Sequence, residues 1–269
     1  MKRLVAVFSL ICASTAAADQ IQPADFANLG SADVVILGEV HDNPAHHANQ
    51  ALAVAVVAPK AIVFEMLSPD QAAKVPEDRA DLNQLESILG WNASGWPDFA
   101  MYHPIFTAAP DARIYGADLP ESTTKLAVKS GAAVAFAADA ALYGLTEPLD
   151  PADQSARQVE QAEAHCNQLP AKLLPGMVQV QRLRDAALAR AVVQAMAETG
   201  GPVAVITGIG HARSDTGMPV PLRAANPDLR VLSIGQFESD PGVAAPYDLW
   251  LITPPHPRQD PCLAFSTEG

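Results

Sequence analysis

Acidic and histidine side chains follow directly after two apolar segments of the chain. Residues 34–47 read VVILGEVHDNPAHH, so Glu39 and His41 come immediately after an apolar run. Residues 203–215 read VAVITGIGHARSD, so His211 follows a second apolar run and a glycine-bounded turn. Carboxylates transfer protons or bind metal ions, and imidazole does both near neutral pH. Chemistry is therefore expected where these two apolar segments end.

Two further carboxylates occupy the same kind of position. Glu65 follows the apolar residues 61–64, and Asp118 follows a short run at residues 113–117. If all of these runs are parallel strands of one sheet, their carboxyl ends lie at one edge, where such sheets bind ligands. This arrangement would bring together the side chains of Glu39, His41, Glu65, Asp118 and His211.

Three interpretations of these side chains stay open. His41, His211 and Glu39 could hold a divalent metal ion that activates water. Alternatively, Glu39 and Glu65 with the two histidines could provide the general acids and bases of a metal-free hydrolase. In a purely structural interpretation, Arg213 neutralises one of the two glutamates, because a carboxylate next to an apolar run needs a partner.

Several common catalytic motifs are missing from the sequence. The chain contains no G-x-S-x-G, no H-E-x-x-H and no C-x-x-C-H. Serine hydrolases of the elbow type, zincins and covalent c-type haem therefore lack support. His46 and His47 are neighbours in a predicted helix, so their side chains point in different directions and only one is expected to join the site.

Short apolar runs that alternate with helical patterns predict an α/β fold with a largely parallel sheet flanked by helices. Pro44 is predicted to open a helix to about Ala58, with Asp42 or Asn43 as its cap, and Pro97 another through Ala109. The predicted strands are Asp33–Leu37, Ala61–Phe64, Arg113–Tyr115, Val203–Thr207, Arg230–Ile234 and Asp248–Ile252.

Residues 121–199 contain no convincing strand and predict a smaller all-helical insertion that covers the sheet as a second layer or lid. Leu188, Val192 and Met196 recur at helical spacing and mark one buried face. Arg182 and Asp185 lie one helical turn apart and are expected to form a supporting pair. The predicted organisation is a signal peptide at 1–18 and an α/β domain at 19–269 that includes this insertion.

The first residues have the pattern of a secretory signal. Lys2 and Arg3 precede an apolar run, and a small-residue cleavage site ends near Ala18. Periplasmic export is therefore expected, and it is favoured over lipoprotein anchoring through Cys12, because such a site needs a small residue where Ile11 stands. No apolar run reaches the length of about 20 residues that a membrane span requires.

Charge and cysteine content narrow the partners and the compartment. The formal charge of −13 argues against nucleic acid and anionic lipid as partners, because both require a basic surface. Cleavage near Ala18 would leave Cys166 and Cys262, which an oxidising compartment would pair in a disulfide; two buried thiols are the alternative.

Several sequence pieces resemble the ChaN-like family, the haem-binding uptake branch of the Tiki superfamily. They keep their order along nearly the whole predicted mature chain. The pieces are residues 38–47 (GEVHDNPAHH) with Gln50, 64–67 (FEML), 95–96 (GW), 102–105 (YHPI), 165–170 (HCNQLP), 181–186 (QRLRDA) and 208–215 (GIGHARSD) with Gly217 and Pro219.

The resemblance implies an exported protein of iron acquisition that binds haem non-covalently between two protomers. In that family, iron is thought to be held through a tyrosine, with basic or histidine side chains on the propionates, and tyrosine is an established haem ligand. Tyr102 and His165 lie in matching pieces, and with Arg213 they are the cofactor-binding residues that we expect. The partners that the resemblance suggests are haem, a second copy of the chain and an outer-membrane haem receptor.

Two other functions stay open. More distant relatives in the superfamily are metal-dependent proteases and erythromycin esterases, which resemble this chain in the Glu/His turns and keep the hydrolase interpretation open. The third function is binding of another small anion, with Arg213 and the glycine-rich turn as anchors.

Overall fold

The computed structural model describes residues 18–29, 31–242, 244–260 and 262–263. Nearly all of the predicted signal peptide, and Cys12 with it, lies outside these residues. In the part of the chain that the structure describes, no helix has the length and apolar character of a membrane span.

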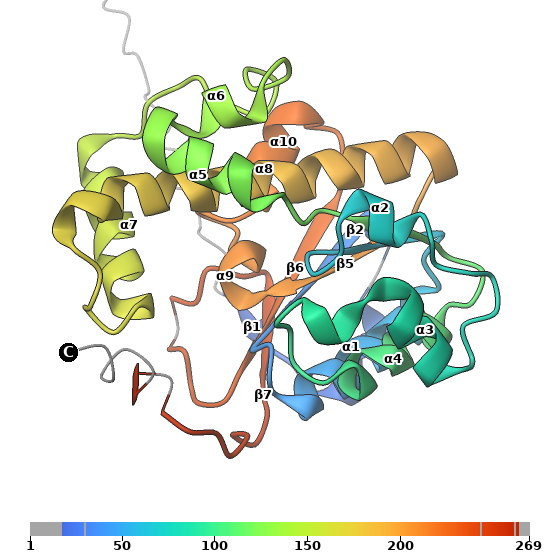
Figure 1. Cartoon of the computed structure of the whole chain (residues 1–269). Coiled ribbons are helices and arrows are strands. Elements are labelled where there is room, and N and C mark those ends of the chain that lie inside the picture. Colours follow the sequence, from blue (N-terminus) through green and yellow to red (C-terminus); the bar gives the residue numbers. More distant parts are fainter. Residues whose placement is uncertain (1–17, 30, 243, 261, 264–269) are drawn as a thin grey trace, which may run out of the picture.

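The described strands form one seven-stranded sheet in which every pairing is parallel (Figure 1). The sheet order is β1-β7-β6-β2-β5-β3-β4. The strands are β1 (Asp19–Gln20), β2 (Val34–Glu39), β3 (Ala61–Phe64), β4 (Arg113–Gly116), β5 (Val203–Gly208), β6 (Val231–Phe237) and β7 (Leu249–Ile252). The predicted α/β class is confirmed, and β1 is the strand that the sequence did not indicate, because it has two residues and no apolar run.

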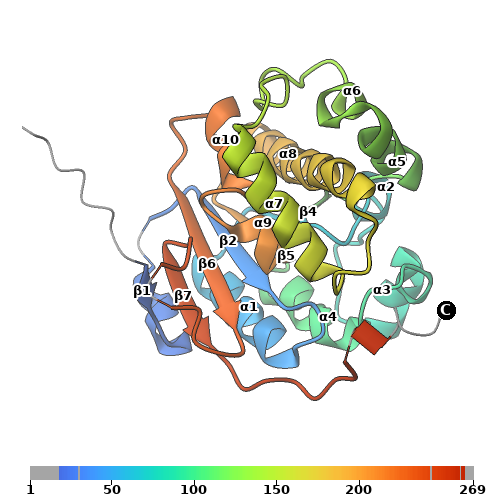
Figure 2. The same cartoon turned by 90° about the vertical axis from the view of Figure 1, so that its left-hand side faces the viewer.

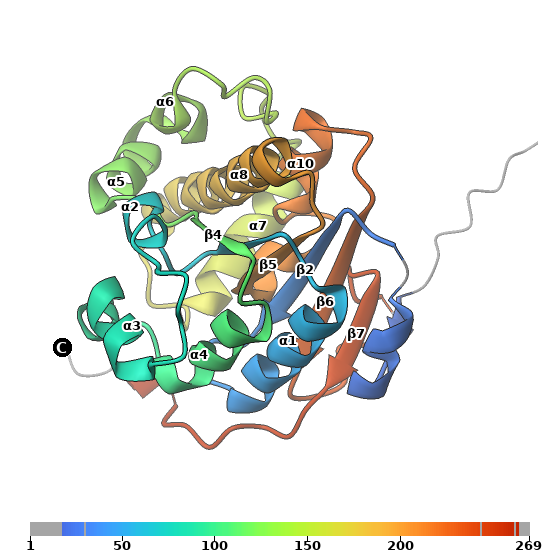
Figure 3. The ribbon, with the colours of Figure 1, turned by 90° about the vertical axis from the view of Figure 1, so that its right-hand side faces the viewer.

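Helices cover both faces of the sheet. They are η1 (Pro23–Asn28), α1 (Pro44–Val57), α2 (Pro69–Ala72), α3 (Leu82–Leu89), η2 (Trp91–Ala93), α4 (Phe99–Ala108), α5 (Glu121–Ser130), α6 (Ala132–Phe136), α7 (Pro151–Ala164), η3 (Ala171–Leu173), α8 (Leu174–Thr199), α9 (Ile209–Ala212) and α10 (Pro219–Ala225). Figure 2 shows α7, α8 and α10 on one side of the sheet, and Figure 3 shows α1 and α4 on the other.

The central strands are buried on both faces, as continuous apolar runs require. Val34 and Ile36 belong to the core under α8, whereas Val35 and Leu37 belong to the core under α1 and α4. Successive side chains of β2 point to opposite faces of the sheet, so this one strand contributes to both hydrophobic cores. α1 begins as predicted, because the Asn43 side chain accepts a hydrogen bond from the Ala45 N–H at 2.9 Å.

The segment from residue 121 to residue 199 is helical and contains no strand. It lies over the sheet as a second layer through the 26-residue helix α8 (Figure 1). Leu188 and Val192 are buried on the predicted face, with Met196 half-buried beside them. A disulfide joins Cys166, after α7, to Cys262 in the C-terminal tail, which confirms the predicted pairing. The boundaries of the helical part as a separate insertion stay a prediction.

Candidate functional site

The carboxyl ends of β2, β5 and β3 lie side by side and bring the predicted acidic and histidine residues together. Glu39 is paired in register with Gly208, and the Glu65 N–H donates to the Ile206 carbonyl at 3.0 Å. We call the side chains that meet here the strand-end cluster. Its members are Glu39, His41, Glu65, Asp185 and His211.

Glu39 is the buried anchor of the first half of the cluster. The residue is 1 % exposed, and its Oε1 is 2.8 Å from His41 Nδ1 and accepts a hydrogen bond from the Tyr102 hydroxyl at 2.9 Å. Its Oε2 accepts from Gln50 Nε2 at 2.7 Å and lies 3.4 Å from His47 Nδ1. A carboxylate can be buried here because both oxygens have partners.

The neighbouring histidines on α1 separate as predicted. His47 contacts Glu39 and also lies 2.8 Å from the His41 carbonyl through its Nε2. His46 instead accepts the Val40 N–H on Nδ1 and approaches Thr253 Oγ1 through Nε2, both at 2.8 Å. Burial lowers the pKa of His46 to about 4, so it is neutral and structural.

His211 forms the second half of the cluster. Its Nδ1 lies 2.7 Å from Asp185 Oδ1, and its Nε2 lies 3.5 Å from Glu65 Oε1. Glu65 Oε2 accepts the Thr207 hydroxyl and the Gly208 N–H, each at 2.7 Å. An aspartate, a histidine and a glutamate are therefore aligned, with the histidine between two carboxylates.

Gly208 allows the two halves to meet. A Cβ at this position would lie 2.8 Å from His41 Nε2 and 3.6 Å from Glu65 Oε2. The backbone at Gly208 is not left-handed, since its φ is −58°. The residue is therefore constrained by close approach: any side chain here would displace His41.

The electrostatics of the cluster favour protonated forms of His41 and His211 next to an ionised Glu65. Burial lowers the pKa of both His41 and His211, but their carboxylate neighbours outweigh burial and leave both pKa values raised. Burial raises the pKa of Glu65, but the two histidines and two hydrogen bonds outweigh it and leave that pKa lowered. Burial also raises the pKa of Asp185. Because the pKa of His211 is raised as well, a proton stays within the Asp185–His211 pair.

A small depression of about 30 Å³ opens beside the cluster. Glu65, Trp96 and Asp118 line it, together with Arg184. The Trp96 ring lies 4.9 Å from the His41 ring, centroid to centroid. Burial raises the pKa of Asp118. Asp118 therefore reaches the edge of the site near Glu65, as the parallel-sheet argument predicts.

The three residues expected to bind a cofactor lie in different places. Tyr102 is fully buried, its hydroxyl donates to Glu39, and burial raises its pKa, which opposes the phenolate that would bind iron. His165 is half-buried after α7. Arg213 pairs with Glu160 at 3.1 Å and Asp215 at 2.9 Å. The structural interpretation in which Arg213 neutralises a strand-end glutamate is therefore wrong.

Arg213 also lines a cavity of about 280 Å³ between the second half of α7, the first turns of α8 and the turn after β5. Gln161 and Ala164 line the same cavity. Gln181 lines it too and reaches His211 Nδ1 at 3.0 Å. The cavity therefore lies behind the second half of the strand-end cluster.

Asp185, Gln50 and Thr207 are the site residues whose contacts the sequence did not indicate. Asp185 was expected to pair with Arg182, but Arg182 donates to backbone carbonyls at Gly144 and Glu147. The one available signal was an ionisable residue on the apolar side of α8, where a carboxylate needs a partner.

For a metal ion, the donor set is weak. Among the described residues, no group of three or more His, Cys, Asp or Glu side chains is placed to hold one. Two histidines paired with carboxylates instead have the geometry of general acids and bases.

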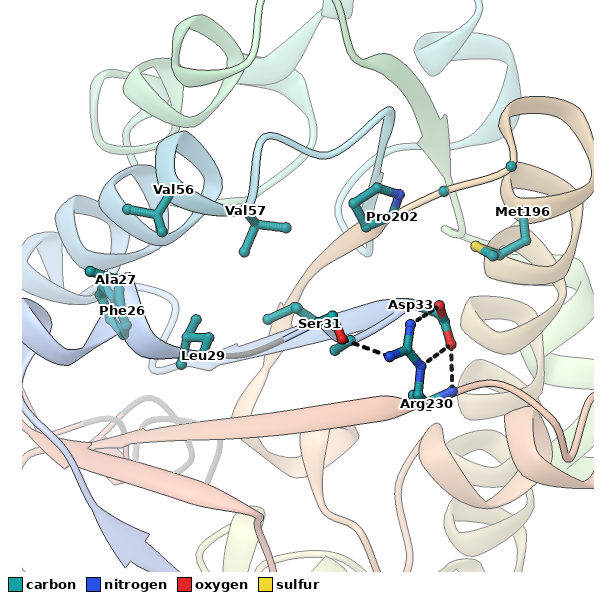
Figure 4. A pocket seen from close by; sticks show the side chains of 14 residues that line it. Phe26, Ala27, Leu29, Ser31, Asp33, Val56, Val57, Met196, Pro202 and Arg230 are labelled. Carbon is teal, nitrogen blue, oxygen red and sulfur yellow. Dashed lines mark hydrogen bonds and ion pairs between the residues drawn. The ribbon is translucent and has the colours of Figure 1, made fainter.

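Another cavity, of about 410 Å³, lies at the amino ends of the strands, opposite the strand-end cluster and near the start of β2 and β5 (Figure 4). Its wall is polar and apolar in about equal parts, and its charged side chains, Asp33 and Arg230, pair with each other at 2.8 Å. The Arg230 guanidinium holds the pKa of Asp33 at about 2, so Asp33 stays ionised near neutral pH and is not suited to proton transfer there.

A solved structure of low sequence identity shares the fold of this chain. The structure titled "Cofacial heme binding to ChaN of Campylobacter jejuni" matches with a TM-score of 0.63 and 17 % identity, over 83 % of this chain and 89 % of that one. The type III effector HopBA1 matches with a TM-score of 0.44 and 12 % identity, over 83 % of this chain and 88 % of that one.

A protein from Bacillus cereus matches with a TM-score of 0.39 and 14 % identity, over 80 % of this chain and 69 % of that one. No curated protein matched the chain. The model of the family described as haem-binding uptake, Tiki superfamily, ChaN matches residues 26–222. Since this match spans most of the sequence, the chain belongs to the ChaN family of haem-binding uptake proteins in the Tiki superfamily.

Proposed function

We propose that this protein is exported and binds haem non-covalently for iron acquisition. The observation that carries the proposal is membership of a haem-binding uptake family over residues 26–222. The ChaN structure from Campylobacter jejuni, whose title states that it binds haem cofacially, shares the fold. The disulfide between Cys166 and Cys262 supports an oxidising compartment.

His165 is the iron ligand that the structure supports best. Its Nδ1 lies 2.8 Å from the Gln161 carbonyl, which can only accept, so Nδ1 carries a proton and Nε2 is the nitrogen that a neutral imidazole would offer to a metal. Metal-binding histidines are commonly oriented by such a bond to a backbone carbonyl. Tyrosine fits less well, because all four tyrosines of the chain are at most 8 % exposed.

Arg213 is the proposed partner of a haem propionate. Arg213 lines the cavity of about 280 Å³. Ala164, the residue directly before His165, lines the same cavity. The cavity, at about 280 Å³, is below the range of about 300–1,000 Å³ typical of sites that enclose a drug-sized ligand. A single chain would therefore leave most of the haem uncovered, which favours a second copy of the chain as the cover.

A hemin titration followed by Soret absorbance, with size-exclusion chromatography before and after, tests the proposal. We expect a saturable shift near stoichiometric haem, weakened in His165→Ala and Arg213→Ala. His256→Ala and Arg223→Ala, which change the same residue types elsewhere on the chain, should behave like wild type. A flat or non-saturating response would refute haem binding. Loss of the shift in Tyr102→Phe but not in His165→Ala would refute the ligand assignment.

A second candidate function is hydrolysis at the strand-end cluster. The observation that favours it is the alignment of Asp185, His211 and Glu65, with distances of 2.7 and 3.5 Å. Glu65 lines the depression beside Trp96, so a substrate group there would lie next to an ionised carboxylate. The lowered pKa of Glu65 suits it to stabilise a protonated His211, whose raised pKa suits it to act as the general acid.

A panel of ester and peptide substrates tests this second function. Turnover that is lost in both Glu65→Gln and His211→Gln, but kept in His256→Ala, would support it. Turnover equal in wild type and Glu65→Gln would refute it. Haem binding that survives both variants would separate the two functions, because the proposed haem contacts lie outside the cluster.

A further inference from the structure

A cavity of about 160 Å³ lies within the helical layer, between the loop before α7, α8 and α10. Most of its wall is apolar, from Tyr143, Leu145, Pro148, Leu149, Val220 and Pro221. Its charged lining consists of Glu147, Arg157, Arg182 and Asp185. Arg157 and Thr216 also line the cavity beside Arg213, so the two spaces adjoin.

Two polar atoms at this cavity have unused hydrogen-bonding capacity. Among the described residues, neither Asp185 Oδ2 nor Arg157 Nε has a hydrogen-bond partner, although both atoms are buried. Asp185 as a residue is 1 % exposed. Buried polar groups are normally satisfied, so an unsatisfied carboxylate oxygen in the wall of a cavity indicates a ligand group.

The two atoms are complementary in what they need. Opposite a protonated His211, Asp185 is a carboxylate whose Oδ2 accepts a hydrogen bond, and Arg157 Nε can only donate one. A hydroxyl or a primary amide does both at once. The other guanidinium, Arg182, already donates to the Gly144 carbonyl at 3.2 Å and the Glu147 carbonyl at 2.9 Å, so it does not compete for the ligand.

The charge at the cavity selects against an ionic head group. Two arginines and two carboxylates line it, so the formal charges cancel. An ammonium group that binds Asp185 would be repelled by the neighbouring Arg157 guanidinium. A carboxylate group that binds Arg157 would be repelled by Asp185. The apolar wall suits a hydrocarbon body, and a cavity of about 150 Å³ is large enough for one benzene ring.

We propose that this cavity binds a small, uncharged molecule with an apolar body and an alcohol or primary amide head, which donates to Asp185 Oδ2 and accepts from Arg157 Nε. The site adjoins the cavity beside Arg213 through Arg157 and Thr216, but neither His165 nor Arg213 lines it. It is connected to the strand-end cluster, because the other oxygen of Asp185 lies 2.7 Å from His211 Nδ1. A ligand on one oxygen of this carboxylate changes the environment of the imidazole on the other.

The test is an NMR titration of the purified protein with four probes of one body and different heads. Benzyl alcohol has the proposed head, toluene has none, benzylamine is a cation and benzoate is an anion. We expect benzyl alcohol to saturate with a Kd at least about tenfold below that of toluene, because one of its two hydrogen bonds to charged groups already corresponds to this factor. Benzylamine and benzoate should bind more weakly than benzyl alcohol, and only benzyl alcohol should shift the His211 ring resonances.

Variants locate the binding. Asp185→Asn keeps an oxygen for His211 but presents an NH₂ to the cavity, so the preference for benzyl alcohol over toluene should disappear. Val220→Phe fills the cavity from its half-exposed rim and should abolish binding of all probes. Val159→Phe, at an exposed position on α7 that does not line the cavity, should bind like wild type.

Three results would overturn the proposal. If no probe saturates, the two buried atoms are satisfied by an ordered water only. If benzyl alcohol and toluene bind equally to wild type, the polar pair does not recognise the head. If Val220→Phe binds as well as Val159→Phe does, the probes bind elsewhere.

Discussion

Replacing Tyr102 with Phe separates a structural role of this tyrosine from a role as iron ligand. The substitution removes only the hydroxyl, which donates to Glu39 Oε1 at 2.9 Å and also lies 3.3 Å from the His41 carbonyl oxygen. The ring keeps its packing against His47 and Trp91, with centroid distances of 4.0 and 4.8 Å. The change therefore tests the hydrogen bond to a buried carboxylate, together with the longer contact to a backbone carbonyl, without leaving a large cavity.

The expected loss in the free energy of unfolding is about 1.5–3 kcal/mol, the range for hydrogen bonds to charged groups. Glu39 keeps His41 on Oε1 and Gln50 on Oε2, so the protein should still fold. For a chain of this length, the loss corresponds to a fall in Tm of roughly 3–12 °C. Urea denaturation followed by circular dichroism measures it.

Tyr115→Phe is the matched control. Its hydroxyl donates to Glu198 Oε2 at 3.0 Å, but that carboxylate is partly exposed, so water replaces the lost bond and the loss should be much smaller. Equal losses in the two variants would refute the role assigned to Tyr102. The hemin titration adds a second readout: an unchanged Soret shift in Tyr102→Phe is expected, and its loss would show that haem reaches this buried hydroxyl.

Three further predictions follow from the geometry. Gly208→Ala should lower the free energy of unfolding by roughly 1–3 kcal/mol, because the new Cβ would lie 2.8 Å from His41 Nε2. Gly210→Ala should lower it far less, because the nearest atom outside its own helix is 3.9 Å from a Cβ there. Equal losses in the two variants would contradict the close-approach argument. The pKa of His211 is raised, so protonation of His211 should stabilise the fold fully below its ordinary pKa of 6.5, and this stabilisation should be lost as the pH rises through the folded-state pKa. The urea midpoints of wild type and His211→Asn should therefore converge with rising pH. A constant gap between them would contradict this. Reducing Cys166–Cys262 should lower stability by up to about 4–5 kcal/mol, because the bond closes a separation of 96 residues; equal urea midpoints with and without dithiothreitol would contradict it.

Local sequence patterns predicted the frame of the protein because the relevant physics is local. Continuous apolar runs between helical patterns marked six strands of the sheet, each within about three residues of its observed ends. Asn43 and Pro44 marked the start of α1 through capping and a fixed φ. The parallel-sheet argument also brought Glu39, Glu65 and His211 to one edge before their contacts were known.

The partners of each polar side chain could not be predicted in the same way. Asp185 was expected to pair along its own helix with Arg182, yet it contacts His211, which lies 26 residues away in sequence. Arg213 was considered as the partner of a strand-end glutamate, yet Glu160 and Asp215 hold it. Long side chains have many neighbours within reach on a surface, and only the packing of whole helices determines which of them is closest.

The sequence by itself determined the fold class, the order of the elements and the edge of the sheet where acidic and histidine residues gather. These follow from hydrophobic periodicity and from the directionality of parallel strands, which act over a few residues or over one sheet. Tertiary structure alone decided that Tyr102 is buried against Glu39, that Gly208 must lack a side chain, and that Asp185 joins His211 to a cavity in the helical layer. Burial and hydrogen-bond partners depend on how α8 and the other helices pack on the sheet, and that packing joins residues far apart in the chain.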